Sequence, residues 1–523
     1  MRRSDRLTGK KRPISQADGS GASVHPQPAS PSRAAVDAEQ SQYGALAATA
    51  PTPGPAAAPA SPPADGADGG RGFRFVDRRA MLRLAGTAAL AAPAGGLLAA
   101  CSGSGSSSGS KVRPVRIGLV TPQSGALSSF ADADLFITDV LKNFFTTNGG
   151  LSVGNSTHPV EIYIRDSESV FARAARATSQ LISDDNVDIV LVGATSDTVN
   201  PVADQCEVNG VPCISTMAPW ESWFLGRGGK LEKPFTWTYH FFAGLSDYYT
   251  AFSSMWGQAE VPTNHKVGAL WPNDTDGQTF ANRGLPFRMR LEAENLNLVS
   301  AGPATGAFEY HLYPPGTKSF TDTIDQFKSQ NVQIVTGIMR AADYVQFQRD
   351  AAQQTFFPKM ITMSKALLFD TDLKVLGGTV ADGLTTEMFW SNNFQTRSFL
   401  TNWTPAQLAD QYQKANGKGW SQQLGTSLAL FDVAAQALAK VNSLDDRKSI
   451  ADALKNLTAR TIVGDVKFGV RKDVPKNVAT IPLNGGQWHW HPDTFTFDLE
   501  QVNNSGNGNV PNSGALRPLN QDA

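Results

Sequence analysis

Apolar and polar residues follow two alternating patterns along residues 111–500 of this chain. Short runs that are apolar throughout, such as residues 187–193, are typical of strands buried on both faces of a parallel sheet. Between these runs, apolar residues recur every three or four positions, which predicts helices with one buried face. The strict alternation of strand and helix therefore predicts an α/β fold, in which helices cover both faces of parallel sheets.

The predicted elements form two series, followed by a mixed final third. The first series has strands at 115–120, 160–165, 187–193 and 211–215, helices at 169–183 and 199–209, and a helix that carries Leu135, Val140, Leu141, Phe144 and Phe145. The second has helices at 247–258, 278–295, 319–330 and 341–354 and strands at 265–271, 296–301, 332–337 and 358–362. In the final third of the chain, the pattern predicts helices at 405–415, 424–440 and 448–457 and β-like segments at 463–470 and 487–497. This order indicates two α/β lobes, with later segments returning to each.

Residues 1–70 differ from the rest of the chain, because Ala, Pro, Gly, Ser and Asp dominate them. Such a segment cannot bury enough apolar surface to offset the entropy lost on ordering. It is interpreted either as a long leader or as the product of a start codon placed too far upstream. Neither interpretation gives the segment a folded function.

An export signal is expected before Cys101. Arg78 and Arg79 precede an apolar run, residues 84–100, which is shorter than the roughly 20 residues of a membrane-spanning helix. The arginine pair resembles a twin-arginine signal, whose cargo is exported folded, and residues 98–101 resemble a lipobox. These resemblances imply cleavage before Cys101, lipidation of its thiol and a membrane-anchored lipoprotein. The alternative is an ordinary membrane anchor or a chance arginine pair.

A flexible tether is expected over residues 102–113, because it begins with an unbroken Gly/Ser run. The body that follows is too long for one typical core and indicates two domains. Lys and Arg total 46 against 47 Asp and Glu, a formal net charge of −1. This balance indicates neither a nucleic-acid surface nor a polybasic membrane patch.

Cys206 and Cys213 are the cysteines that remain beside Cys101. A short helix–strand turn would bring their thiols together in an oxidising compartment, so a disulfide is favoured over two free thiols. The loop that it closes is short, which limits its stabilisation to about 2–3 kcal/mol. The sequence near this pair has no His or further Cys, which argues against a metal site.

Several motifs of the body occur in a characteristic order. They are IGLVTPQSG at 117–125, IVLVGATS at 189–196, GVPCIS at 210–215, WPNDTDGQ at 271–278, YPPGTKSF at 313–320 and LALFDVA at 428–434. Behind a lipoprotein signal, this set resembles the extracytoplasmic solute-binding proteins of ABC importers, in the branch typified by leucine/isoleucine/valine and amide receptors. The resemblance extends from Val115 to about Phe497.

The resemblance implies the type I periplasmic-binding-protein fold, in which three crossovers join two doubly wound parallel-sheet lobes. The crossovers are expected near Tyr239, Phe389 and Val463. Lobe I is then expected at 114–239 and 389–462, lobe II at 240–388 and 463–500, and a polar tail at 501–523.

Proteins of this family bind a small solute between the lobes and close around it by a hinge motion. The resemblance therefore implies a monomeric receptor, without cofactor or catalytic activity, that captures an amino-acid, amide or carboxylate-type solute and delivers it to a permease and its ATPase. A lipid on Cys101 would hold the receptor in the periplasm or at the cell surface, close to that permease. The alternative is a ligand sensor of the same fold that acts through a partner protein.

Candidate ligand-binding residues follow from the resemblance and lie in the loops after strands. Helix N-termini meet these loops, and their unpaired N–H groups suit a carboxylate. By position, Ser196 is the first candidate, followed by Thr195, Thr216 and Ser124. The alternative is that these residues serve only as helix N-caps.

Lys365 departs from the family pattern. Amino-acid receptors of this family place an acidic residue after the strand predicted to end at Thr362, where this chain has a lysine three residues later. A lysine would repel an ammonium group and favour a carboxylate or a neutral polar group. Asp274, Asp276 or Glu387 could supply negative charge from neighbouring loops. The expected solutes therefore include amides, carboxylates and aromatic compounds besides branched-chain amino acids.

Aromatic residues gather near the predicted rim of the cleft, namely Trp220, Trp223, Phe241, Trp271, Phe389 and Trp390. Trp220 and Trp390 are expected in ligand-facing loops, where their rings would stack on a planar or apolar solute. The alternative is packing between the lobes and long loops, which is favoured for Trp223 and Trp271.

Enzymatic functions find little support. Spacing of the Gly-x-Ser-x-Gly type occurs only in the tether, so a hydrolase nucleophile is not indicated. His489 and His491 would share one face of a strand, but no acidic or Cys partner follows them at the spacing of a metal site. No catalytic or metal-ligating residue is therefore predicted.

Overall fold

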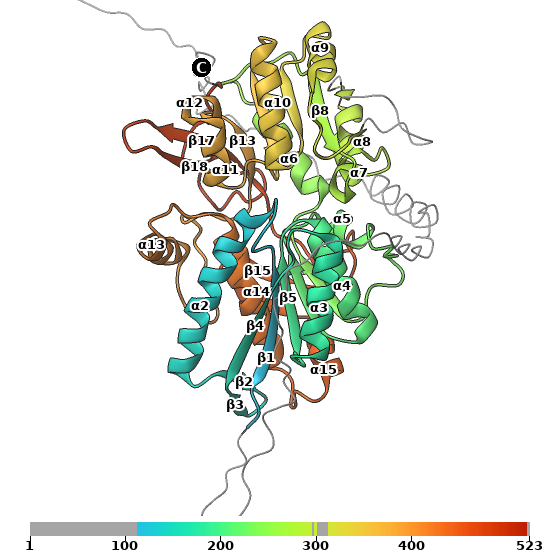
Figure 1. The fold of residues 1–523 in the computed structure, drawn as a ribbon, viewed down its shortest axis with the longest axis vertical. Helices are drawn as coiled ribbons and strands as arrows, with labels where there is room; N and C mark the ends of the chain where they lie inside the picture. The colour runs from blue at the N-terminus through green and yellow to red at the C-terminus, as the bar shows by residue number, and fades with distance from the viewer. Residues whose placement is uncertain (1–111, 295, 297, 301–311, 520–523) are drawn as a thin grey trace, which may run out of the picture.

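The computed structural model describes residues 112–519, apart from 295, 297 and 301–311. Within these residues the chain forms two large β-sheets with helices around them, one above the other in Figure 1. We call the part built on the sheet that contains the first strand lobe I, and the part built on the other sheet lobe II. The predicted α/β class with parallel sheets is confirmed.

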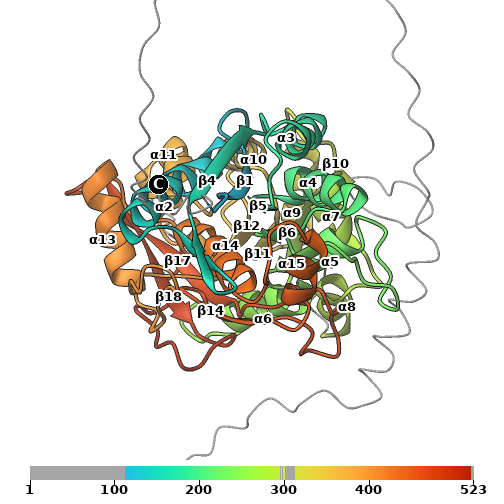
Figure 2. The ribbon, with the colours of Figure 1, turned by 90° about the horizontal axis from the view of Figure 1, so that it is seen from below.

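Lobe I is built on a six-stranded sheet of the order β16-β7-β6-β5-β1-β4, in which every neighbouring pair is parallel. The strands are β1 (Val115–Thr121), β4 (Val160–Asp166), β5 (Ile189–Gly193), β6 (Cys213–Thr216), β7 (Thr238–Phe241) and β16 (Val478–Ala479). Figure 2 shows α3 (Phe171–Ser183) and α4 (Ser196–Asn209) on one side of this sheet and α14 (Gln423–Leu438) on the other. Because both faces are covered, β5 is buried at every position.

Around this sheet lie shorter helices and two hairpins. They are η1 (Ser128–Phe130), α2 (Ala131–Asn148), α5 (Trp220–Phe224), α13 (Pro405–Asn416), α15 (Arg447–Leu454), the hairpin of β2 (Leu151–Val153) with β3 (Ser156–His158), and the hairpin of β14 (Thr458–Thr461) with β15 (Gly464–Lys467). The late helix α14 packs on α2, β5 and β6, so almost its whole surface is buried in lobe I.

Lobe II is built on an eight-stranded sheet of the order β10-β8-β11-β12-β13-β17-β18, with β9 also beside β8. Its pairs are parallel as far as β13, and β17 and β18 add an antiparallel edge. The strands are β8 (Val267–Pro272), β9 (Leu298–Ser300), β10 (Leu312–Tyr313), β11 (Ile334–Ile338), β12 (Met360–Ser364), β13 (Thr385–Met388), β17 (Asn484–His491) and β18 (Thr496–Asn503).

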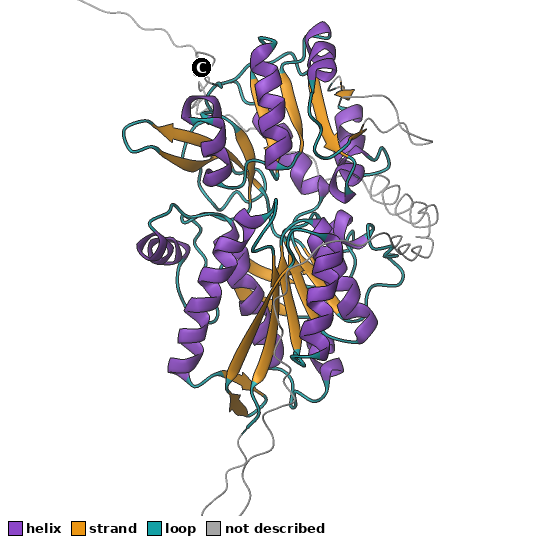
Figure 3. Ribbon diagram, in the orientation of Figure 1, coloured by secondary structure: helices purple, strands orange, loops and turns teal. Residues whose placement is uncertain are grey.

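The helices of lobe II lie around this sheet, as the colouring of Figure 3 shows. They are α6 (Leu245–Trp256), α7 (Thr275–Ala281), α8 (Pro286–Ala293), α9 (Thr321–Ser329), α10 (Ala341–Gln353), α11 (Asp370–Leu376) and α12 (Gly378–Ala381). Among the described residues, none of the helices combines the length and the apolar character needed to cross a membrane.

The helix predicted over residues 278–295 is two helices in the structure. The helix α7 begins earlier than predicted, because Asp274 caps it by accepting a hydrogen bond from the Gly277 N–H at 2.9 Å. The helix α8 begins at Pro286, its first helical position. Proline lacks the N–H that a continuous helix would use there. The cap therefore fixes the loop at the carboxyl end of β8.

Three connections join the lobes, and the third lies later than predicted. The first follows β7 and the second follows β13, close to the predicted positions near Tyr239 and Phe389. For the third, Val463 is too early, because β16 pairs with β7 through Val478 opposite His240. The chain thus adds an edge strand to the sheet of lobe I before it enters lobe II at β17.

The segment predicted as a polar tail from residue 501 is partly built into lobe II. The strand β18 continues to Asn503, and Val510 and Leu516 are buried. Gln501 holds the following loop, because its side-chain amide donates to the Val510 carbonyl at 2.9 Å and its N–H donates to the Ser513 hydroxyl at 2.8 Å. A largely polar composition therefore conceals two apolar anchors.

Candidate functional site

A small cavity lies between the lobes, where the carboxyl ends of strands from both sheets meet. Its volume is about 20 Å³, which is room for about one water molecule. Loops after β5 and β6 of lobe I and after β12 and β13 of lobe II supply much of its lining. The lining residues are Phe130, Thr195, Met217, Pro219, Phe242, Tyr248, Asp276, Ile338, Ser364, Lys365, Leu368, Glu387 and Phe389.

Aromatic contacts close the apolar part of this cavity. Phe242 and Phe389 come from the first two connections between the lobes, and their rings meet edge to face at 5.1 Å between centroids. Phe130 of lobe I meets Phe369 of lobe II in the same way at 4.8 Å. Most of the wall is therefore apolar, and one aromatic pair joins the two lobes directly.

The cation in the lining, Lys365, is paired within its own lobe. Its Nζ lies 2.8 Å from Asp276 Oδ2 and 3.5 Å from Asp274 Oδ2, and all three side chains are at most 5% exposed. Burial acts to lower the pKa of Lys365, but the two carboxylates raise it above its ordinary value. Burial acts to raise the pKa of Asp276, but Lys365 lowers it below its ordinary value. The contact is therefore an ion pair.

Polar bonds across the interface start at the N-terminus of α4. The Ser196 hydroxyl donates to Asp276 Oδ1 at 2.5 Å, and the Arg340 guanidinium donates to Asp197 Oδ2 at 3.0 Å. An acidic side chain of lobe II therefore lies at the positive end of a lobe I helix, where a negative charge is stabilised. These bonds fasten the lobes in the conformation seen here.

Met217 and Lys365 line the cavity from corresponding places in the two lobes. Each directly follows a strand, β6 in lobe I and β12 in lobe II, and each has a left-handed backbone, with φ of 75° and 69°. Residues with a side chain adopt this conformation at a cost of about 1–3 kcal/mol, and they cluster at functional sites. The shared left-handed backbone of these two residues therefore supports a functional site at the cavity.

Glu387 is buried in the lining but is not the partner of Lys365. The Ser364 hydroxyl donates to its Oε1 at 2.7 Å, and the Thr386 hydroxyl donates to its Oε2 at 2.9 Å. Burial raises the pKa of Glu387 above its ordinary value. Both of its carboxyl oxygens are thus engaged within lobe II.

Thr195 is the N-cap residue of α4, but its side chain does not cap the helix. Its hydroxyl oxygen is buried without a hydrogen-bond partner among the described residues, and the residue is 4% exposed. A buried polar atom without a partner is costly unless something else satisfies it. Thr195 therefore offers the cavity an unused hydrogen-bonding group.

Of the nine predicted ligand-binding residues, the structure gathers five at the cavity. Thr195, Lys365 and Glu387 line the cavity. Ser196 donates a hydrogen bond to Asp276 of the lining, and Asp274 pairs with Lys365. The sequence pattern did not indicate Arg340, which lies in the loop after β11 and bonds to Asp197 at the site.

The other four predicted residues lie outside the lining. Ser124 is exposed and donates to Asp166 at 2.7 Å, while Thr216 donates to the Phe241 carbonyl at 2.7 Å. Trp220 is buried as the first residue of α5, and Trp390 is fully buried. The ring of Trp390 meets that of Trp420 edge to face at 5.7 Å, so it packs inside the protein instead of facing the cavity.

The contact between Trp390 and α14 gives a stability prediction. A methyl group on Gly425 would lie 2.4–2.7 Å from three atoms of the Trp390 ring. Replacing Gly425 with alanine should therefore lower the free energy of unfolding by about 1–3 kcal/mol, although alanine favours the helix. Gly419→Ala is the matched control, because a methyl group there meets nothing within 4 Å. Denaturant unfolding curves that coincide for the two variants would contradict this role of Trp390.

The two cysteines of the body differ from the expected disulfide. Cys206 and Cys213 are free and buried in the structure. Burial, with Cys213 beside it, raises the pKa of the Cys206 thiol well above its ordinary value. The thiols are thus neighbours, as the predicted helix–strand turn requires, and their pairing after export stays a prediction. Cys101 lies outside the described residues.

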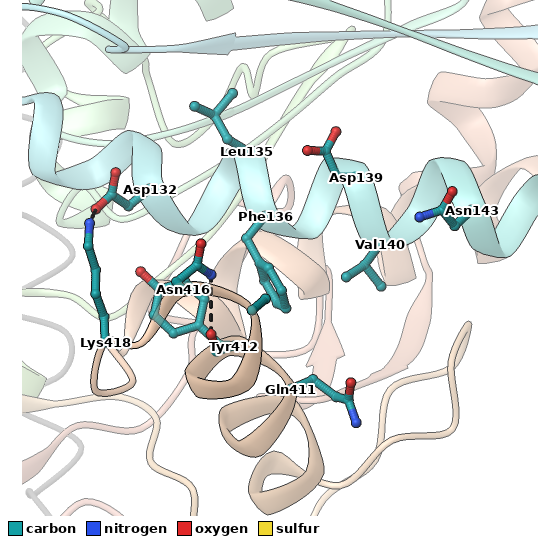
Figure 4. Close-up of a pocket in the computed structure, with 11 residues that line it drawn as sticks. Asp132, Leu135, Phe136, Asp139, Val140, Asn143, Gln411, Tyr412, Asn416 and Lys418 are labelled. Carbon is teal, nitrogen blue, oxygen red and sulfur yellow. Dashed lines mark hydrogen bonds and ion pairs between the residues drawn. The ribbon is translucent and has the colours of Figure 1, made fainter.

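A larger pocket, of about 510 Å³, lies between α2 and α13 on the outside of lobe I (Figure 4). Figure 4 shows the ion pair of Asp132 and Lys418 at one end of the pocket. The Lys418 Nζ lies 2.6 Å from Asp132 Oδ2, and both side chains are 48% exposed. Its lining comes from lobe I alone and is open to solvent. Strand ends, buried charges and left-handed residues converge at the cavity between the lobes but not at this larger pocket. We therefore place the candidate site at the cavity between the lobes.

The histidines considered as metal ligands are engaged in lobe II. His489 Nδ1 lies 3.1 Å from Asp382 Oδ1, and His491 Nε2 lies 2.9 Å from Asp498 Oδ2. Within the described part of the chain, no three metal-ligating side chains come together.

Comparison with known proteins gives a family match and several similar folds. Residues 114–480 match the model of a family described as periplasmic binding protein. No curated protein matches the sequence. The fold resembles the leucine-binding protein LivK of Thermotoga maritima, with a TM-score of 0.57 and 14% identity over 76% of this chain and 99% of that one.

Two further structures were solved with a ligand. LivJ, the branched-chain amino acid transporter substrate-binding protein of Streptococcus pneumoniae, in complex with isoleucine, has a TM-score of 0.57 and 14% identity over 78% of this chain and 100% of its own. A solute-binding protein of an ABC transporter from R. palustris, in complex with 4-hydroxybenzoate, has a TM-score of 0.58 and 14% identity over 75% of this chain and 96% of its own. At these identities, the likeness shows a shared fold.

Proposed function

The chain belongs to the family of periplasmic binding proteins, and we propose that it is the solute receptor of an ABC importer. In this role it captures a small solute between its lobes and delivers it to a membrane permease and its ATPase. The observation that carries the proposal is the cavity lined by both lobes and bridged by the Ser196–Asp276 and Asp197–Arg340 bonds. The family binds solutes and is not enzymatic.

A hinge motion is the expected working movement. The lobes are joined by three connections, and two of them supply Phe242 and Phe389 to the cavity. Small changes in such connections can separate two rigid lobes. The cavity has room for about one water molecule, which is too small for a solute. A solute therefore enters only after the lobes separate. The bound state must then hold the lobes farther apart than they are here.

The chemistry of the lining supports a small solute of amino-acid, amide or carboxylate type. Aromatic and aliphatic side chains supply most of the wall, while hydroxyl and carboxyl groups supply a few polar points. This combination is typical of small-molecule sites. Two of the similar structures hold isoleucine and 4-hydroxybenzoate, and each of these ligands combines an apolar body with polar groups.

We further propose an exported, membrane-anchored lipoprotein. The support is the twin-arginine-like pair Arg78 and Arg79 and the lipobox-like ending at Cys101, all outside the described residues. A lipid on Cys101, followed by the Gly/Ser tether, would hold the receptor near its permease and raise the rate of encounter.

A ligand screen tests the proposed receptor function. A solute that binds only the folded state stabilises it by mass action, by about 2.7 kcal/mol at 100 times its dissociation constant. We therefore expect at least one member of a set of amino acids, amides, and aromatic and aliphatic acids to raise the melting temperature with a saturable concentration dependence. Isothermal calorimetry should then give one solute per chain. A well-folded protein that no member of the set stabilises would contradict the proposal.

A further inference from the structure

The charged side chains that line the cavity already have partners within the protein. Lys365 is paired with Asp276 and Asp274, and Asp276 also accepts the Ser196 hydroxyl. Both oxygens of Glu387 accept hydrogen bonds from neighbouring hydroxyls. Because Asp276, Lys365 and Glu387 are the charged members of the lining, the described residues of the cavity leave no free charge for a solute.

This internal pairing persists when the lobes separate. Asp274 caps α7, Asp276 lies in its first turn and Lys365 follows β12, so all three belong to lobe II. Glu387 and its donors Ser364 and Thr386 belong to the same sheet. Opening the lobes breaks the Ser196–Asp276 bond but leaves the ion pair and the carboxyl group of Glu387 with their partners. Opening also breaks the Asp197–Arg340 bond, but neither residue belongs to the lining, and Asp274 Oδ2 stays 3.9 Å from Arg340 Nε. Among the described residues of the lining, the open site therefore has no free charge.

A charged solute would have to break this pairing or remain unpaired itself. A carboxylate that took Lys365 would leave Asp276 buried without its counter-ion, and an ammonium group that took Asp276 would leave Lys365 with Asp274 alone, at 3.5 Å. Either exchange removes the nearest partner of a buried charge, which is unfavourable. A carboxylate at the N-terminus of α4 would also meet Asp197, the second residue of that helix.

An uncharged hydrogen-bonding group, in contrast, finds a matching partner. Thr195 lines the cavity and is only 4% exposed. Its hydroxyl group has no hydrogen-bond partner among the described residues. On opening, the Ser196 hydroxyl next to it becomes available as well, because its acceptor belongs to lobe II. An amide or hydroxyl group can both donate to and accept from these side chains.

Resting on the proposed receptor function, we propose that the solute is uncharged, with an apolar body and an amide or hydroxyl group. The body contacts the walls around Phe130, Phe242, Leu368 and Phe389, and the polar group meets Thr195 and Ser196. The ion pair of Lys365 acts as a neutral polar surface of the site. Free amino acids and carboxylates are thereby excluded.

Matched pairs of compounds with the same skeleton test this specificity. The first pair is 4-hydroxybenzamide and 4-hydroxybenzoate, and the second is 4-methylpentanamide and 4-methylpentanoate, with leucine as the zwitterion. By calorimetry at neutral pH, we expect at least one amide to bind about tenfold or more tightly than its carboxylate. Tighter binding of a carboxylate or of leucine would overturn this inference and leave the receptor function intact. Failure of these and of the whole earlier set would overturn both.

A variant should weaken the preference. Asp276→Asn keeps the shape of the side chain but leaves Lys365 with Asp274 alone, at 3.5 Å. We expect the affinity for 4-hydroxybenzoate, relative to that for 4-hydroxybenzamide, to rise about tenfold. Asp410→Asn, which removes a carboxylate that is 51% exposed on α13, is the control. An unchanged preference in a folded Asp276→Asn protein would contradict the neutral role of the pair, and the wild-type comparison holds even if this variant fails to fold.

Discussion

Replacing Lys365 with methionine should lower the free energy of unfolding by about 3–5 kcal/mol, the usual cost of breaking a buried ion pair. The ammonium group lies 2.8 Å from Asp276 and 3.5 Å from Asp274, and its side chain is 5% exposed. Methionine has a similar length but no charge, so two buried carboxylates lose their counter-ion. Desolvation then acts on them without compensation.

Two further variants separate the charge effect from a packing effect. Lys374→Met removes a cation that is 47% exposed and paired with Asp370 on α11, so its effect should stay within about 0.5 kcal/mol. The double variant Lys365→Met with Asp276→Asn removes both charges and should recover a large part of the loss. Urea unfolding followed by tryptophan fluorescence measures all three. A double variant less stable than Lys365→Met would show that charge is not the cause.

The sequence predicts well the strands whose buried side chains are apolar. The strand β5 is a continuous apolar run, so its pattern identifies it directly. The strand β13 is equally buried but reads Thr-Thr-Glu-Met, and no strand is expected there. Its side chains are satisfied by neighbours, as when Thr385 and Thr362 hydroxyls meet at 2.7 Å. Hydrophobic periodicity cannot detect a strand whose polar groups find partners in the fold.

The site could be predicted as a set of loops but not as a set of contacts. The order of strands places Thr195 and Lys365 at the edge where the two sheets meet. The partner of Lys365 is Asp276, which lies 89 residues away in sequence, and the choice among three nearby acidic residues depends on how α7 begins. The capping of α7 by Asp274 and the break before Pro286 decide this.

Trp390 illustrates the opposite error. A tryptophan after a strand near the lobe connection suggests a ring that faces a solute, yet its ring is fully buried against Trp420 and α14. The informative residue is Gly425, where a helix interior has no side chain and the ring takes its place. A glycine inside a strongly apolar helix can therefore indicate the packing of a large ring from elsewhere in the chain.

Asp432 provides the second large effect, because it lies fully buried in α14. Its Oδ1 accepts hydrogen bonds from the Ser398 hydroxyl at 2.8 Å and the Leu400 N–H at 3.0 Å, and Oδ2 accepts one from the Ile462 N–H at 3.3 Å. Burial raises the pKa of Asp432 to about 7 in spite of these donors. This carboxyl group ties α14 to two loops of lobe I.

The stabilising effect of Asp432 should decrease as the pH rises towards neutrality. Its pKa of about 7 lies above the ordinary value of 3.8, so the folded state binds the proton more tightly than the unfolded chain. The stabilisation is therefore fully present below about pH 4 and is lost as the pH rises through about 7. At about 1.4 kcal/mol for each pH unit, the total change is about 4 kcal/mol.

Asp432→Asn removes this titration and isolates its contribution. The amide cannot accept at both positions, which lowers stability by an amount that does not depend on pH. The free energy of unfolding of the wild type minus that of the variant should therefore fall by about 4 kcal/mol between about pH 4 and pH 8. Urea titrations across this range measure it, with the exposed Asp410→Asn variant as the control. A difference that stays constant over the range would mean that Asp432 is already ionised in the folded protein at acidic pH, held by its three donors against the cost of burial.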